Sequence, residues 1–157
     1  MVALVTKDQE RLGIHRTYLA RDGSGKAPID PQKMTLGPMH GGAVRLGPPA
    51  ESILITEGIE TALSVMQATG QVAWAALSAN GIANLELPDL VRDVTICVDG
   101  DRVSEDAAAK AERRWLLQKR QVRIARPPPN RDFNDMLMEE VTDGYSGHNQ
   151  QSGSVNT

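Results

Sequence analysis

Between residues 50 and 142, short apolar runs alternate with segments of helical periodicity. Four of the runs are predicted strands, and they lie at 52–56, 72–77, 94–98 and 122–125; the first and third are rich in β-branched residues. Helices are predicted at 59–69, near 82–85, at 105–119 and from about residue 134. Gly70 is expected to end the first helix, and Ser104 to cap the start of the third. The pattern predicts an α/β fold around a central, mostly parallel, four-stranded sheet.

Residues 1–49 follow a different pattern and are predicted to form a small N-terminal β-rich extension with a linker. Strands are expected at 14–20 and 41–46, and the Gly and Pro residues between them favour irregular or hairpin structure over a helix. The run Gly23-Ser24-Gly25-Lys26 lacks the earlier Gly and the final Ser or Thr of a phosphate-binding loop, so a hairpin turn is favoured. The tail at 143–157 is polar and Gly/Ser/Asn-rich, and it is predicted to be disordered.

Composition narrows the class of protein. A chain of 157 residues with 40% hydrophobic residues is long enough for one hydrophobic core. The lone Cys97 lies inside an apolar run and is expected to be a buried, inert thiol, which permits neither an internal disulfide nor a cysteine-based zinc site. No apolar segment resembles a signal peptide or a transmembrane helix. We therefore expect a cytoplasmic protein without a membrane partner.

Carboxylates follow two of the predicted strands at the point where each ends. Glu57 comes directly after the run at 52–56, and Asp99 and Asp101 follow the run at 94–98. Because the carboxyl ends of parallel strands meet at one edge of a sheet, the three side chains are expected to share a rim. Gathered carboxylates repel one another unless a cation neutralises them, and oxygen ligands suit Mg²⁺ or Mn²⁺. The alternative for each acid is a helix cap.

A third acidic group follows the fourth predicted strand and its three prolines. It contains Asp132 and Asp135, which could supply further metal ligands at the same rim. A residue of this turn could equally cap the last helix, and the two interpretations are evenly balanced.

Together, these motifs resemble the Toprim domain, which bacterial primases, topoisomerases and some nucleases share. The run from Ile55 to Ser64 and the turn from Asp132 to Asp135 are similar to the primases of phages and plasmids, as is the segment from Gly13 to Leu19. The resemblance spans roughly residues 13 to 138. It implies a Rossmann-like Toprim domain at 50–142. One departure is Ser104, which stands where the family usually has Gly.

The resemblance also implies residue roles. Glu57 would be a metal ligand or general acid/base, Asp99 and Asp101 would coordinate Mg²⁺ (or Mn²⁺), and Asp132 and Asp135 would be auxiliary acids. The reaction would be nucleotidyl transfer that joins ribonucleoside triphosphates into an RNA primer on single-stranded DNA. A replicative helicase is a possible partner, and the chain could be a fragment of the active enzyme. A Toprim nuclease and a non-catalytic module that binds nucleic acid or a replisome protein remain alternatives.

Basic residues concentrate in one stretch, since nine of the 17 Lys and Arg lie between Arg102 and Arg131. A solvated helix face explains part of this concentration. Arginine also suits bidentate contacts to phosphate, which makes nucleic-acid binding the functional interpretation. The candidates for this role are Arg113, Arg120, Arg126 and Arg131. The candidates for nucleotide contact are His15, Arg16 and Lys33, for which a structural role is at least as well supported. The same two interpretations apply to Lys26.

Overall fold

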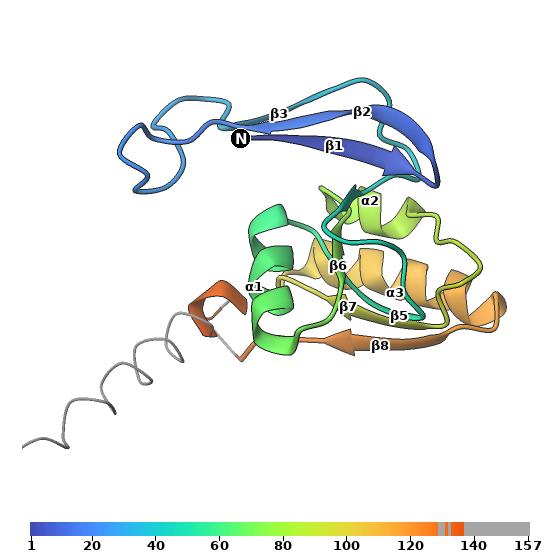
Figure 1. Cartoon of the computed structure of the whole chain (residues 1–157). Helices are drawn as coiled ribbons and strands as arrows, with labels where there is room; N and C mark the ends of the chain where they lie inside the picture. The colour runs from blue at the N-terminus through green and yellow to red at the C-terminus, as the bar shows by residue number, and fades with distance from the viewer. Residues whose placement is uncertain (129–130, 132, 137–157) are drawn as a thin grey trace, which may run out of the picture.

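The computed structural model describes residues 1–128, 131 and 133–136. The N-terminal part is a three-stranded antiparallel sheet in the order β1-β2-β3. Its strands are β1 (Val2–Lys7), β2 (Glu10–Thr17) and β3 (Lys33–Leu36). Figure 1 shows this sheet as a separate layer beside the α/β unit. The prediction of a β-rich N-terminal part is confirmed, although its strands begin and end elsewhere than expected.

The α/β unit is built on a five-stranded sheet in the order β4-β6-β5-β7-β8. Its strands are β4 (Val44–Arg45), β5 (Ser52–Thr56), β6 (Ala73–Ala75), β7 (Asp93–Cys97) and β8 (Gln121–Ala125). Strands β5 to β8 pair in parallel, and β4 pairs antiparallel with β6. The predicted α/β fold with a mostly parallel sheet is confirmed, with one strand more than expected. That strand, β4, lies within the strand expected at 41–46, but it pairs with β6 of this sheet and does not belong to the N-terminal sheet.

Helices cover both faces of this sheet. Helix α1 (Ile59–Thr69) lies on one face, while α2 (Ala79–Asn84) and α3 (Arg102–Leu117) lie on the other (Figure 1). The core splits accordingly into two clusters, and Trp74 and Trp115 are fully buried in the α2–α3 layer. Cys97 is buried in the α1 layer, as predicted.

The helix ends differ from prediction at one informative place. Gly70 ends α1 in a left-handed conformation at φ 69°, as expected. Ser104 is not the N-cap of α3, because the helix begins at Arg102 and Asp101 is the cap. A carboxylate oxygen of Asp101 accepts a hydrogen bond from the Ser104 backbone N–H at 2.7 Å. Asp101 therefore has the capping role that the sequence left open as the alternative for each rim acid.

Backbone pairing fixes the N-terminal sheet to the α/β unit. Thr6 and Ala43 exchange two N–H···O hydrogen bonds of 3.0 Å. Side chains alternate along β2, so His15 and Thr17 are buried while Arg16 lies on the other side of the strand. Thr17 pairs across the sheet with Lys33, which places Lys33 on the same face as the buried pair. One face of this small sheet therefore carries His15 and Lys33 towards the α/β unit.

Candidate active site

The strand register brings the first two predicted acids to one edge. Thr56 at the end of β5 pairs with Cys97 at the end of β7, so Glu57 and Asp99 leave the sheet at the same rim. Both line a cavity of about 430 Å³. Its other charged or titratable lining residues are His15, Lys26, Lys33 and Glu60. The cavity therefore lies between the rim of the α/β unit and the N-terminal layer.

The carboxyl group of Glu57 has a pKa raised above its ordinary value. Burial raises its pKa, and the negative charge of Asp99 raises it further. A hydrogen bond of 3.3 Å from the Ser104 hydroxyl to Glu57 Oε2 acts in the opposite direction. Asp101 adds a smaller repulsion. The three acids thus interact electrostatically, and a cation among them would relieve the repulsion.

Ser104 gives the departure from the family pattern a physical role. Its hydroxyl bonds Glu57 and its backbone N–H bonds Asp101, so one buried residue connects two rim acids. A glycine here would keep the backbone bond and lose the hydroxyl.

The donor set fits a hard divalent cation. Glu57, Asp99 and Asp101 offer carboxylate oxygens, the ligand type that Mg²⁺ and Mn²⁺ prefer. Within the described residues, no three acidic, histidine or cysteine side chains already converge closely enough to hold an ion. One of the three carboxylates, that of Asp101, instead accepts the hydrogen bond from the Ser104 backbone N–H at the start of α3.

The third acidic group reaches the rim only in part. Asn134 lines the cavity, and its side-chain oxygen accepts a hydrogen bond of 3.0 Å from the Ser64 hydroxyl on α1. Asp135 is exposed and lies outside the cavity lining. Asp132 falls outside the described residues. The role of both aspartates as auxiliary ligands stays a prediction.

The cationic side of the cavity comes from the N-terminal part. Lys26 Nζ and Lys33 Nζ each lie 3.2 Å from a carboxylate oxygen of Glu60. Burial and the neighbouring charge of Lys33 lower the pKa of His15. For Glu60, burial acts to raise the pKa, but a backbone hydrogen bond and the two lysines outweigh it and lower the pKa overall.

Lys26, for which nucleotide contact and a structural role were both open from the sequence, lines the cavity. Glu60 had no role assigned from the sequence. It lies in the first turn of α1, three residues after Glu57, and this closeness in sequence was the available signal. Arg16, a predicted nucleotide contact, lies outside the cavity lining, and its guanidinium instead approaches the Met34 sulfur at 3.9 Å.

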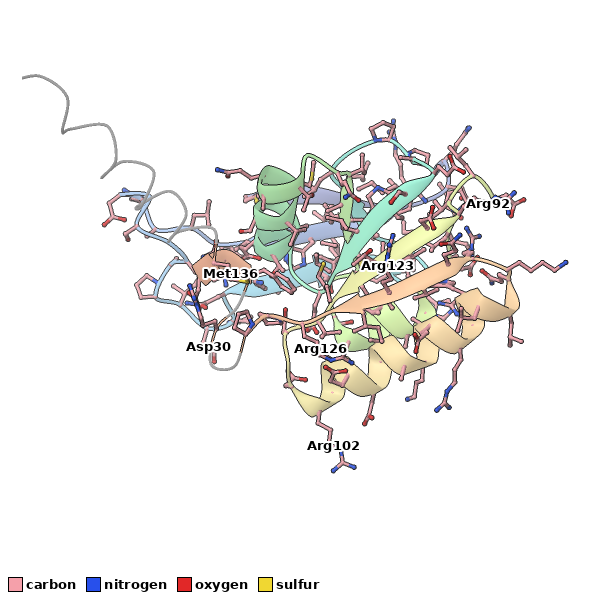
Figure 2. The ribbon with its side chains drawn as sticks, turned by 90° about the horizontal axis from the view of Figure 1, so that it is seen from below. Asp30, Arg92, Arg102, Arg123, Arg126 and Met136 are labelled. Carbon is pink, nitrogen blue, oxygen red and sulfur yellow. The ribbon has the colours of Figure 1, made fainter. Side chains whose placement is uncertain are left out.

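The predicted nucleic-acid arginines differ in environment. Arg120 is buried, and its guanidinium donates to the backbone carbonyls of Leu87, Pro88 and Val91. This guanidinium closes a loop and is not presented to a polyanion. Arg126 is exposed and makes a bidentate pair with Glu105 at 2.7 and 2.8 Å. Figure 2 shows Arg126 at the exit of β8, beside the start of α3. Arg113 is exposed, and Arg131 is partly buried.

The raised pKa of Glu57 predicts a pH-dependent stability difference between the metal-free chain and its Glu57→Gln variant. A folded-state pKa above the unfolded value means that folding favours the protonated carboxyl. This stabilisation is fully present below about pH 4.5, the ordinary value, and is lost as the pH rises through the folded-state value. Urea unfolding in a chelator should therefore show the parent chain losing stability relative to Glu57→Gln between pH 4.5 and neutrality. A difference that stays constant with pH would contradict the assigned cause.

Comparison with known proteins agrees with this architecture. The Toprim domain family matches residues 52–143, and a domain of unknown function, DUF7146, matches residues 1–46. No curated protein matches the chain by sequence. Among the described residues, no helix has the length and apolar character needed to cross a membrane.

A solved structure shares the fold. The chain superposes on the crystal structure of the Aquifex aeolicus primase (zinc-binding and RNA polymerase domains) with a TM-score of 0.56 and 17% sequence identity. The match covers 98% of this chain and 40% of the primase chain. Since the Toprim match takes in more than half of the 157 residues and includes the acidic rim, the chain belongs to the Toprim domain family.

Proposed function

We propose that the chain carries the nucleotidyl-transfer site of a primase-type enzyme, which joins ribonucleoside triphosphates on single-stranded DNA with Mg²⁺ or Mn²⁺. The observation that carries the proposal is the cavity of about 430 Å³, in which rim acids face basic residues of the N-terminal sheet. A cavity of this size is in the range of small-molecule sites. Acids and bases on opposite walls suit a ligand that arrives with phosphates and a divalent cation.

In this proposal, Glu57, Asp99 and Asp101 hold the cation. When bound, the ion would neutralise phosphate charge and help to align the attacking hydroxyl with the phosphorus atom. Ser104 positions Glu57 through its hydroxyl and keeps Asp101 at the start of α3. Glu57 in its ionised form is also placed to accept a proton at the rim, because its raised pKa makes it a better base than an ordinary glutamate.

The N-terminal sheet would orient the nucleotide. His15 and Lys33 line the cavity and are proposed to contact the incoming phosphates, whereas Arg16 is left out because it lies on the other side of β2. Template binding is proposed for Arg113, Arg126 and Arg131, and Arg120 is left out because carbonyl oxygens already engage its guanidinium. The chain spans 40% of the primase chain that it matches, so a helicase partner belongs to a proposal about the complete enzyme.

The test is the identity of the product. The chain is incubated with single-stranded DNA, labelled ribonucleoside triphosphates and Mg²⁺ or Mn²⁺, and the products are separated by length and end group. The proposal expects short RNA that retains a 5′-triphosphate. Metal-dependent shortening of the DNA without RNA would instead assign the same acids to a nuclease. Metal-independent DNA binding without any turnover would leave a nucleic-acid-binding module.

A further inference from the structure

One carboxylate on α1 neutralises two lysines that arrive from the N-terminal part. Glu60 Oε1 pairs with Lys26 and Glu60 Oε2 pairs with Lys33, each at 3.2 Å. The three side chains keep 38–40% of their surface exposed, while the Glu60 Oε1 atom itself is buried. All three residues line the cavity that contains Glu57 and Asp99.

A buried histidine beside these lysines has an unused ring nitrogen. His15 is only 5% exposed, lines the same cavity, and leaves Nδ1 without a hydrogen-bond partner. Its other ring nitrogen lies 3.3 Å from the Thr17 hydroxyl. Buried polar atoms are almost always paired, so an unpaired one in a residue that lines a cavity is a candidate partner for a bound ligand.

We infer that His15, Lys26 and Lys33, the cationic pocket, bind the polyphosphate group of a nucleoside triphosphate, and that Glu60 occupies this pocket until the nucleotide displaces it. The inference rests on the proposed function for the identity of the nucleotide. The carboxylate of Glu60 is the anion that the two lysines hold in the empty protein. A triphosphate offers more charge and more acceptor oxygens than one carboxylate, which favours exchange.

Location favours a polyphosphate over the phosphates of a DNA strand. The pocket shares its cavity with Glu57 and Asp99, two of the residues that would hold the proposed cation. DNA carries its phosphates singly along an extended backbone, whereas two lysines and a histidine gathered in one cavity match several linked phosphates. Partly exposed ion pairs are individually weak, so the two pairs with Glu60 do not prevent displacement.

The experiment measures metal-free binding of tripolyphosphate by calorimetry in a chelator. Glu60→Gln should tighten binding by roughly threefold to tenfold, because it removes a competing anion and keeps the shape of the side chain. Lys26→Ala and Lys33→Ala should each weaken binding by a similar factor. The matched controls are Lys7→Ala and Glu86→Gln, which break an ion pair of 2.9 Å outside the cavity and should leave binding unchanged.

Several outcomes would overturn the inference. If Glu60→Gln weakens tripolyphosphate binding as the lysine variants do, Glu60 positions the lysines and does not compete. If an oligodeoxynucleotide gains affinity in Glu60→Gln while tripolyphosphate does not, the pocket binds template phosphates. Thermal unfolding of each variant checks that the fold is intact.

Failure of this inference is distinguishable from failure of the proposed function. The pocket is supported, even where no RNA is made, if Glu60→Gln binds tripolyphosphate more tightly than the parent chain and both lysine variants bind it more weakly. If the chain makes primers but tripolyphosphate binding is unchanged by Glu60→Gln, Lys26→Ala and Lys33→Ala, the inference about the pocket is overturned and the proposed function stands. The variants should rank in the same order by their affinity for a nucleoside triphosphate. Their affinity for a nucleoside monophosphate should change much less on Glu60→Gln substitution.

Discussion

The Asp99→Asn chain is expected to lose more than about 100-fold of its Mg²⁺-dependent nucleotide joining, a larger loss than substitution of an outer-shell residue normally causes. Asp99 leaves β7 at the rim, and its charge raises the pKa of Glu57, so the two groups share one electrostatic site. Asparagine keeps the size and removes the charge that would hold the cation. The measurement is the initial rate of primer synthesis as a function of Mg²⁺ concentration.

Asp93 provides a matched control for this variant. It begins β7, the strand that Asp99 follows, and therefore lies at the opposite edge of the sheet. Asp93→Asn makes the same chemical change away from the cavity and should retain the parent rate. Equal losses in the two variants would mean that Asp99 acts through the fold, and an unchanged Asp99→Asn rate would remove it from the site.

Gly81→Ala is expected to destabilise the fold by about 2–4 kcal/mol. A Cβ atom at Gly81 would clash with the backbone carbonyl oxygen of Ala76, which a side-chain rotation cannot relieve. The affected turn supports the site, because the Ala76 N–H bonds the Thr56 carbonyl at 2.9 Å and the Leu77 N–H bonds the Glu57 carbonyl at 2.8 Å. Urea unfolding measures the change.

Gly58→Ala serves as the control for stability. Its added Cβ would come no closer than 3.4 Å to Glu60 and 3.6 Å to Thr61, which is ordinary contact, and its φ of −93° suits any residue. We expect a change within about 1 kcal/mol for this variant. If Gly81→Ala changed the free energy of unfolding as little as Gly58→Ala, the proposed clash with the Ala76 carbonyl oxygen would be contradicted.

The sequence predicted the placement of Glu57 and Asp99 because that placement depends on local signals. Apolar runs mark β5 and β7, and parallel strands deliver whatever follows them to one edge. The positions of α1 and its Gly70 end were equally predictable from periodicity and one glycine.

What could not be predicted depends on contacts between distant segments. Lys26 and Lys33 meet Glu60 only because the N-terminal sheet is fixed beside the α/β unit through Thr6 and Ala43. Arg120 follows a long helix and has the sequence context of a surface arginine, yet carbonyls about 30 residues earlier in the chain enclose its guanidinium. No periodicity or motif encodes such pairings.

At Ser104 the unusual residue type could be recognised from the sequence, but its contact with Glu57 could not. Its departure from the family glycine was visible in the sequence, and a small polar residue near a helix start suggested a cap. The cap is Asp101, three residues earlier, and the Ser104 hydroxyl is directed to Glu57 on another strand end. The cap was misplaced because it depends on where the helix begins. A helix boundary is predicted less reliably than the helix itself, and α3 begins at Arg102, three residues before the predicted start.

The most direct test of the proposed metal centre is Mn²⁺ anomalous diffraction from crystals of the chain soaked with Mn²⁺ and a ribonucleoside triphosphate. The account predicts an anomalous peak at the rim, with carboxylate oxygens of Glu57 and Asp99 at roughly 2.0–2.6 Å and phosphate density reaching towards Lys26 and Lys33. A fully occupied Mn²⁺ site elsewhere, with an empty rim and ordered nucleotide, would contradict it.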